Sequence, residues 1–339
     1  MSLPTDTAGL KAALAPYQRP SHRRSILEIA VTALPLAAFW ILALLAVGRG
    51  WWWGVILTAP AAVFLVRLFM IQHDCGHASF FRSSAANAWT GRVIGVLTAT
   101  PYDYWRRTHA IHHATSGNLD RRGLGAVETL TVEEYRARPW LLRAAYRLYR
   151  HPLVMFGLGP CYMFVLQHRA PIGLMREGRA WLSVLGNNLG LAVLILPQIL
   201  LAGPVAFLTV HLTIVVLAAS IGVWLFYLQH QFEGARWTRN DRWSLHEAAL
   251  HGSSYLHLPP ILRWCTANIG AHHVHHAGSK IPFYRLPQVL DDHPQLQTMS
   301  RITLGDSFKA MRLSLWDEAN GRLISFREAR RTVRAVQGA

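Results

Sequence analysis

The chain has 339 residues, of which 52% are hydrophobic, and its mean hydropathy of +0.19 is high for a water-soluble protein. The formal net charge of +16 suits an anionic membrane surface or an acidic redox partner. Nucleic-acid binding is disfavoured, because no known nucleic-acid-binding motif appears. Three cysteines without CxxC spacing, Cys75, Cys161 and Cys265, predict free thiols rather than a disulfide framework.

The N-terminal part predicts a polar segment followed by a helical hairpin. Residues 1–25 carry several basic side chains and lack the apolar core of a signal peptide, so we expect them to be cytosolic. Residues 26–47 are apolar and long enough to span a bilayer, and after a Gly-Arg-Gly turn a second arm runs over 51–72. Three consecutive tryptophans open that arm, as in an interfacial aromatic belt.

A second hairpin is predicted over residues 181–227, with arms at 181–201 and 204–227. The apolar stretch 152–167, of about 16 residues, is short for a span, so we interpret it as interfacial or re-entrant. The preceding stretch 141–150 mixes Leu, Tyr and Arg like a helix on a membrane surface. If 152–167 crossed the membrane, His230 would lie opposite the other histidine clusters.

Charge distribution predicts the orientation of the chain. Of 34 Lys and Arg residues, only Arg49 falls in a predicted outer turn. The positive-inside rule therefore places both termini and all histidine clusters in the cytoplasm. We predict one all-α, polytopic domain with four spans, interfacial helices and a cytosolic helical cap. Its segments are 1–25, the hairpin 26–72, a cytosolic and interfacial part 73–180, the hairpin 181–227, and a cytosolic C-terminal region 228–339, in which 304–336 forms one or two amphipathic helices.

Eight histidines fall in three clusters at helical spacing. The first reads HxxxH, and the other two read HxxHH. Side chains three and four residues apart share one helix face, so each cluster can direct its imidazoles to one point. Neutral imidazole binds iron, copper, zinc and nickel, and the number of ligands suits two metal ions with open positions. This pattern predicts redox or oxygen chemistry at His73, His77, His109, His112, His113, His272, His275 and His276; a set of ordinary surface or core histidines is the weaker interpretation.

These motifs and their flanks resemble those of the membrane-bound fatty-acid desaturases, most closely the bacterial acyl-lipid (omega-6/delta-12-like) type. The resemblance covers roughly residues 68–287 in matching order and rests on HDCGHASFF (73–81), THAIHHATSGNLDRRG (from 108), TLTVEEY (129–135), FYLQHQFE (226–233), and NIGAHHVHH (268–276) with IPFYRLP (281–287). Three ordered histidine boxes separated by hairpins are far more specific than one HxxHH.

The resemblance implies an oxygen-dependent diiron centre held by the eight box histidines. It adds His230, which precedes the third box, as a further ligand, and it leaves His273 at a variable position. Such a reaction removes two hydrogens from an unactivated methylene pair, which side-chain acids and bases cannot do, so the metal must supply that chemistry. The chain has no GxGxxG fingerprint and no CxxC pair. A separate ferredoxin or cytochrome b5-like electron donor is therefore implied.

Residues near the boxes are candidates for supporting roles. A ligating histidine usually donates its outer N–H to a carboxylate or carbonyl, which points to Asp74, Asp120, Glu233 and Asp241, with Asn268 acting through a water; ordinary solvation or capping is the alternative for each. Trp105, Trp224 and Trp264 are candidates for lining an acyl tunnel, although belt or core positions are more common for tryptophan. For Arg67, inside the second span, we prefer snorkelling to the interface over headgroup contact.

We therefore predict an integral-membrane enzyme that introduces a cis double bond into a long acyl chain, and the resemblance alone implies that this chain is lipid-linked. A fatty-acyl or alkane hydroxylase on the same scaffold is the nearest alternative, because rebound of oxygen after the first hydrogen abstraction gives an alcohol. A histidine-rich metal transporter is less favoured, since the clusters gather at one membrane face and no ladder of intramembrane acidic residues is visible.

Overall fold

The computed structural model describes residues 7–337, so the first six and last two residues of the predicted terminal segments lie outside it. By length and composition, four helical stretches of the described chain suit a membrane span. They are α2 (His22–Gly48); η2 (Trp52–Leu57) with α3 (Thr58–Gly76); α9 (Gly178–Ala202); and α10 (Pro204–Phe207) with the π-helical turn η6 (Leu208–Leu212) and α11 (Thr213–His230). The predicted hairpins are confirmed, with ends that differ by a few residues.

The four spans divide into an inner and an outer pair. In their most apolar windows, 56% of residues are buried in the span ending at Gly76 and 44% in the span ending at His230, against 28% for α2 and 17% for α9. Leucines such as Leu182, Leu189 and Leu200 cover the outside of α9 and are exposed. The outer helices therefore present apolar side chains to lipid, while α3 and α11 pack inside the bundle.

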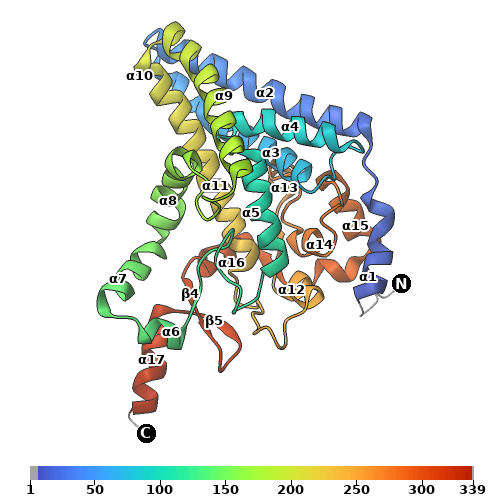
Figure 1. The fold of residues 1–339 in the computed structure, drawn as a ribbon, viewed down its shortest axis with the longest axis vertical. Helices are drawn as coiled ribbons and strands as arrows, with labels where there is room; N and C mark the ends of the chain where they lie inside the picture. Colours follow the sequence, from blue (N-terminus) through green and yellow to red (C-terminus); the bar gives the residue numbers. More distant parts are fainter. Residues whose placement is uncertain (1–6, 338–339) are drawn as a thin grey trace.

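Both hairpin turns lie at one end of the molecule, at the upper left of Figure 1. The approach is close: a Cβ on Gly48 would lie 3.4 Å from the Cβ of Ala202. Since each inner helix runs from such a turn to the opposite end, His73 near the end of α3 and His230 at the end of α11 emerge on the same side.

The stretch between the hairpins contains no further candidate span. Its last part starts with α7 (Trp140–Tyr149) and continues through a π-helical turn η3 (Val154–Leu158), α8 (Gly159–Cys161), a second π-helical turn η4 (Tyr162–Leu166) and the 3₁₀ turn η5 (Gln167–Arg169). Exposed leucines run along it, among them Leu153 and Leu158. No helix of this stretch is among the candidate spans, and its assignment as interfacial or re-entrant stays a prediction.

The remaining helices surround the end of the bundle that carries the histidines. Several are short and lie near the third box (Figure 1). The helices are α1 (Thr7–Leu14), η1 (Ala15–Gln18), α4 (Ser84–Leu97), α5 (Tyr102–Thr115), α6 (Val132–Ala137), α12 (Leu245–His251), α13 (Pro260–Cys265), α14 (His272–Ala277), η7 (Phe283–Arg285), α15 (Leu286–Asp292), η8 (Pro294–Gln297), α16 (Leu304–Ala310) and α17 (Phe326–Gln337).

Five short strands add two small sheets to this mostly helical fold. In the first, β4 (Leu313–Asp317) pairs parallel with β1 (Leu130–Thr131) and antiparallel with β5 (Arg322–Ser325). In the second, β2 (Tyr255–His257) pairs parallel with β3 (Arg301–Thr303).

The β4–β5 hairpin corrects the prediction that 304–336 is wholly helical. α16 and α17 are helices as predicted, but the residues between them form strands. The turn explains the difference, because Asn320-Gly321 is a strong hairpin signal and Gly321 adopts φ of 59°, a conformation that favours glycine. Side chains of Leu315, Trp316 and Ile324 are buried, so the strands add to the core.

Arg150, at the end of α7, fastens this hairpin to the spans. Its side chain is 4% exposed and donates to the carbonyl of Leu313 (2.8 Å), to Oε1 of Gln231 (2.8 Å) and to the hydroxyl of Tyr227 (3.1 Å). A buried guanidinium needs such acceptors. The end of α11 is therefore tied to the C-terminal hairpin.

The predicted snorkelling of Arg67 is wrong, and its side chain does not reach a lipid headgroup position either. The residue is 1% exposed and forms an ion pair with Glu28 of α2. Its Nε donates to the Thr32 hydroxyl (3.1 Å), and its guanidinium lies 4.0 Å from the ring centroid of Trp264. Because Glu28 supplies a counter-charge inside the bundle, the arginine is held there. Trp264, a predicted tunnel residue, thus covers this ion pair.

Candidate metal centre

Four helices direct nine histidines toward one region at the end of the spans. α3 carries His73 and is followed directly by His77, and α11 ends at His230. α5 carries the second box on one face, and α14 starts at the first histidine of the third box. Gly117, just after α5, has φ of 72° and turns the chain away, and its carbonyl accepts from the amide of Thr238 (2.9 Å).

The nine side chains separate into two groups. One ligand atom from each residue of a group lies within 4.8 Å of those of the other members. The first group is His73, His77, His109, His113 and His275; the second is His112, His230, His272 and His276. The second and third boxes contribute histidines to both groups. The first box contributes only to the group of five. The predicted ligands are therefore brought together, and His273 is not among them.

The hydrogen bonds of His230 show which of its nitrogens faces inward. Its Nδ1 lies 3.2 Å from the carbonyl oxygen of Gly252, which can only accept, so we infer that Nδ1 carries the proton. The Nε2 then has only a lone pair, yet it lies 3.1 Å from the Nε2 of both His112 and His272. That single lone pair can accept from only one of these two nitrogens, so the three converging nitrogens together fit a cation between them.

The group of five has the same geometry. The Nε2 of His109 lies 3.0 Å from that of His77 and 3.1 Å from that of His113. A neutral imidazole has one donor and one acceptor nitrogen, so these contacts cannot all be hydrogen bonds. Both groups therefore fit an imidazole-bound metal ion, and imidazole ligands suit zinc, copper, iron and nickel.

Burial keeps these imidazoles uncharged and able to bind a metal. Desolvation is the main reason that protonation of these rings is unfavourable. Repulsion from neighbouring imidazoles adds to it, and for His77 repulsion from Arg106 does so as well. These effects hold the pKa well below its ordinary value for the ligand candidates outside the spans, His77, His109, His112, His113, His272, His275 and His276.

Among the predicted supporting carboxylates, Asp74 lies beside a ligand candidate. Its Oδ1 is 3.4 Å from Nδ1 of His73, and its Oδ2 accepts from the amide of Phe283 (2.7 Å). Asp74 is 1% exposed. The carboxylate thus joins the first box to the segment after the third. The predicted amide, Asn268, also contacts this segment, since its Nδ2 donates to the Phe283 carbonyl (3.2 Å).

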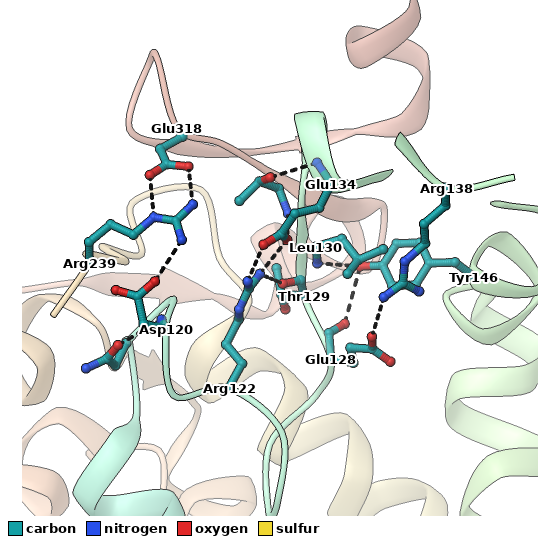
Figure 2. Close-up of polar contacts among 12 residues, drawn as sticks. Asp120, Arg122, Glu128, Thr129, Leu130, Glu134, Arg138, Tyr146, Arg239 and Glu318 are labelled. Carbon is teal, nitrogen blue, oxygen red and sulfur yellow. Dashed lines mark hydrogen bonds and ion pairs between the residues drawn. The ribbon is translucent and has the colours of Figure 1, made fainter. Parts of the chain in front are cut away.

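The other predicted carboxylates are exposed, and none has a described contact with a histidine. Asp120 accepts from Nη1 of Arg239 (2.7 Å) and from the amide of Asn240 (2.8 Å), and Arg239 also pairs with Glu318 next to β4 (Figure 2). Asp241 is exposed beside Arg242, and Glu233 is exposed. The prediction that these side chains orient ligands is wrong for Asp120. This residue follows the second box closely in sequence, but its carboxylate binds Arg239, which in turn pairs with Glu318 beside the β4–β5 hairpin. For Glu233 and Asp241, exposure argues against the role.

The predicted tunnel tryptophans have different surroundings. The ring of Trp105 stacks on that of His109, with centroids 4.6 Å apart and planes 14° from parallel, and lies 5.4 Å from the ring of Phe69. Trp224 is partly buried against the main core. Among the described residues, Trp105 is thus the one predicted tunnel tryptophan that contacts a ligand candidate. It lies between His109 and Phe69 of α3.

Sequence analysis missed several groups that touch the second set of histidines. The Phe226 ring lies 5.1 Å from that of His112, and the Ser116 hydroxyl is 3.2 Å from Nδ1 of His230. The carbonyl of Gly252 holds the same nitrogen. A backbone carbonyl leaves no signal in the sequence. Phe226, by contrast, lies four residues before His230 and so on the same helix face, which could have identified it.

Comparison with known proteins assigns the chain to a family. The family model described as "Fatty acid desaturase" matches residues 50–306, which include all nine histidines. The chain belongs to the fatty acid desaturase family. The resemblance predicted from the histidine boxes is thereby confirmed, and the protein is a membrane desaturase, an oxidoreductase.

Characterised relatives of this desaturase include bacterial proteins. A "Fatty acid desaturase" of Bacillus subtilis (strain 168) is 41% identical over 93% of this chain and 89% of its own length. An "sn-1 acyl-lipid omega-3 desaturase (ferredoxin)" of Synechocystis sp. is 30% identical over 65% of this chain and 61% of its own. An "sn-1 oleoyl-lipid 12-desaturase" of Synechocystis sp. is 25% identical, with 69% and 64% covered. The match spans less than two thirds of either Synechocystis protein.

Proposed function

We propose that this desaturase uses two histidine-bound iron ions, dioxygen and external electrons to introduce a cis double bond into a long acyl chain of a membrane lipid. The observation that carries the proposal is the pair of histidine groups whose ring nitrogens converge at one end of the spans. Nitrogen ligands alone, four and five to a group, leave coordination positions open and suit oxygen chemistry.

Bound iron would allow O2 to act as the oxidant: the two hydrogens removed from the methylene pair, two external electrons and two protons together reduce O2 to two waters. The residues of the chain hold and shield the site. His73 and His230 lie at or near the ends of α3 and α11, and in the proposed arrangement an acyl chain would enter from the lipid beside them. Trp105 adds an apolar wall against His109, which excludes water from that side.

The substrate and donor are inferred from chemistry and from the relatives. Two of the relatives act, by name, on sn-1 acyl lipids, and one name includes ferredoxin. Without a nucleotide fingerprint or CxxC pair, this chain requires a separate donor. A net charge of +16 would attract an acidic ferredoxin or cytochrome b5-like protein. We also propose that both termini and the histidines face the cytoplasm, since Arg49 is the one basic residue in the outer turns.

The test is a fatty-acid profile by gas chromatography–mass spectrometry in a bacterial host whose lipids are only monounsaturated. The chain is expressed with a ferredoxin and its reductase, beside a His112→Ala control. A new dienoic acid that is absent from the control is the expected result and locates the double bond. A hydroxy acid would instead support the hydroxylase. No new product, with iron confirmed in the purified protein, would contradict an acyl substrate.

A further inference from the structure

Two ligand candidates of the second group, His112 and His272, have a buried outer nitrogen without a partner among the described residues, and of the two His112 lines a cavity. The Nε2 of His112 is directed at the second group, 3.1 Å from Nε2 of His230, so the N–H must be at Nδ1 when a metal is bound. Nδ1 is buried and has no hydrogen-bond partner among the described residues. A metal-binding histidine ordinarily donates this proton to an acceptor that fixes the ring. His230 has such an acceptor in the Gly252 carbonyl, and His112 does not.

His112 lines a small cavity. His112, His230, Ser116 and Trp237 are among its lining residues, with Ala126 and Val127 from the loop after α5. Its volume is about 20 Å³. About 10–15 Å³ is sufficient for one water molecule, provided that polar groups surround it.

Trp237 supplies a second unpaired donor at the cavity. The residue is 7% exposed, and its Nε1 is buried without a partner among the described residues. An indole N–H can only donate, and so can the N–H of a metal-bound imidazole. Two buried donors need an acceptor, and the oxygen of a water offers two lone pairs. The Ser116 hydroxyl on the same wall can accept from that water.

We propose that this cavity binds one ordered water, which accepts hydrogen bonds from Nδ1 of His112 and Nε1 of Trp237 and so orients His112 toward its metal. Trp237 is thereby a positioning residue that acts through the water. The inference rests on the proposed metal centre. It explains why His112 needs no carboxylate, and why none of the predicted carboxylates lies beside it.

The first test is a cryo-electron microscopy map of the metal-loaded enzyme at a resolution that shows buried waters. A peak within hydrogen-bond distance of both nitrogens is expected, and it should be lost in Ala126→Leu, whose larger side chain fills the cavity. A dry cavity in a map that resolves other buried waters would overturn the proposal.

The second test is a Co²⁺ titration of the purified, metal-free chain, followed by visible absorption. Trp237→Phe keeps the aromatic ring but removes the donor. It and Ala126→Leu should each weaken one of the two Co²⁺ sites by about 10–100-fold, with no further loss in the double variant. The matched control is Trp316→Phe in β4, because Trp316 is also buried with an unpaired Nε1 but does not line the cavity. It should bind Co²⁺ like the wild type.

The outcomes separate this inference from the proposed function. Unchanged Co²⁺ affinity in both cavity variants would overturn the water's role while leaving the metal centre intact. An equal loss in Trp316→Phe would also overturn it, since the effect would then arise from general packing. Failure of the wild-type chain to bind any Co²⁺ would contradict the proposed metal centre itself, and the water with it.

Discussion

At the scale of single residues, neighbouring histidines of one box have different surroundings. Nε2 of His272 lies 3.1 Å from Nε2 of His230, inside the second group. Nε2 of His273 lies 2.9 Å from the carbonyl of Leu296, and burial lowers its pKa to about 4. Consecutive residues on a helix point about 100° apart, so only one of the two can face the metals. His273 instead fastens α14 to the chain near η8.

Alanine substitution should separate these two roles. His272→Ala removes a proposed ligand, so we expect bound iron to fall from two ions per chain to one, with the metal-free protein about as stable as the wild type. His273→Ala should keep both ions but lower the free energy of unfolding by about 1–3 kcal/mol, because it leaves a buried carbonyl unpaired. Iron content and unfolding of the metal-free form measure the two effects. The reverse ranking would contradict the ligand register.

The two aspartates near the boxes offer a second comparison. Asp74→Asn keeps one acceptor oxygen but replaces the other with a donor, so it cannot satisfy both Nδ1 of His73 and the Phe283 amide. We expect metal affinity in the group of five to fall by about tenfold, as measured by competition with a chelator. Asp120→Asn is the control, since Asp120 pairs with Arg239 at the surface. A larger effect of Asp120→Asn would reverse our assignment.

At the scale of elements, a buried ion pair joins the two arms of the first hairpin to the region before the third box. Glu28 of α2 and Arg67 of α3 are 2% and 1% exposed. Arg67 also donates to the carbonyl of Trp264 in α13. A charge at this depth is costly unless it is paired, so the pair fixes how α2, α3 and α13 fit together.

Removal of one partner should therefore be worse than removal of both. Arg67→Met leaves Glu28 without this buried partner, and we expect it to lower the free energy of unfolding by about 3–5 kcal/mol. The double variant Glu28→Met with Arg67→Met should recover most of that loss, because no charge is left in the interior. Unfolding in mixed detergent micelles measures both. Equal losses in the single and double variants would count against the proposed coupling.

At the scale of the whole molecule, the fold gathers ligands that lie up to about 200 residues apart in the chain at one end of four spans. The inner helices α3 and α11 each bring a histidine, and the extramembrane helices α5 and α14 close over them. The C-terminal β4–β5 hairpin packs on the same end through Arg150. The site therefore depends on the two hairpins having the same orientation in the membrane.

Sidedness can be measured with fusions at the C-terminus. If both termini lie in the cytoplasm, a green fluorescent protein fused there should fluoresce, and an alkaline phosphatase should stay inactive. Arg49 is a basic residue in a turn that we propose to lie outside, so Arg49→Ala should leave this pattern unchanged or strengthen it. Active phosphatase at the C-terminus would contradict the proposed orientation, either because all four spans are inverted or because residues 152–167 also cross the bilayer.

Much of this protein could be predicted from sequence because the signals are local. Long apolar runs predicted the spans, and histidines at helical spacing predicted which side chains gather. These patterns depend on periodicity and composition, which a single stretch of chain already contains. The β4–β5 hairpin was missed although Asn320-Gly321 marked it, because its basic, mixed composition was interpreted as an amphipathic helix.

The sequence by itself determined the membrane class, the family and the nine histidines. Only the tertiary structure decided how those histidines divide into groups of five and four, that Asp74 and not Asp120 lies beside a ligand, and that Arg67 is paired inside the bundle. The reason is physical: each of these facts depends on contacts between distant segments, whose partners are chosen by packing, counter-charge and backbone carbonyls. Such choices have no periodicity along the chain, and so they become visible only when the chain is folded.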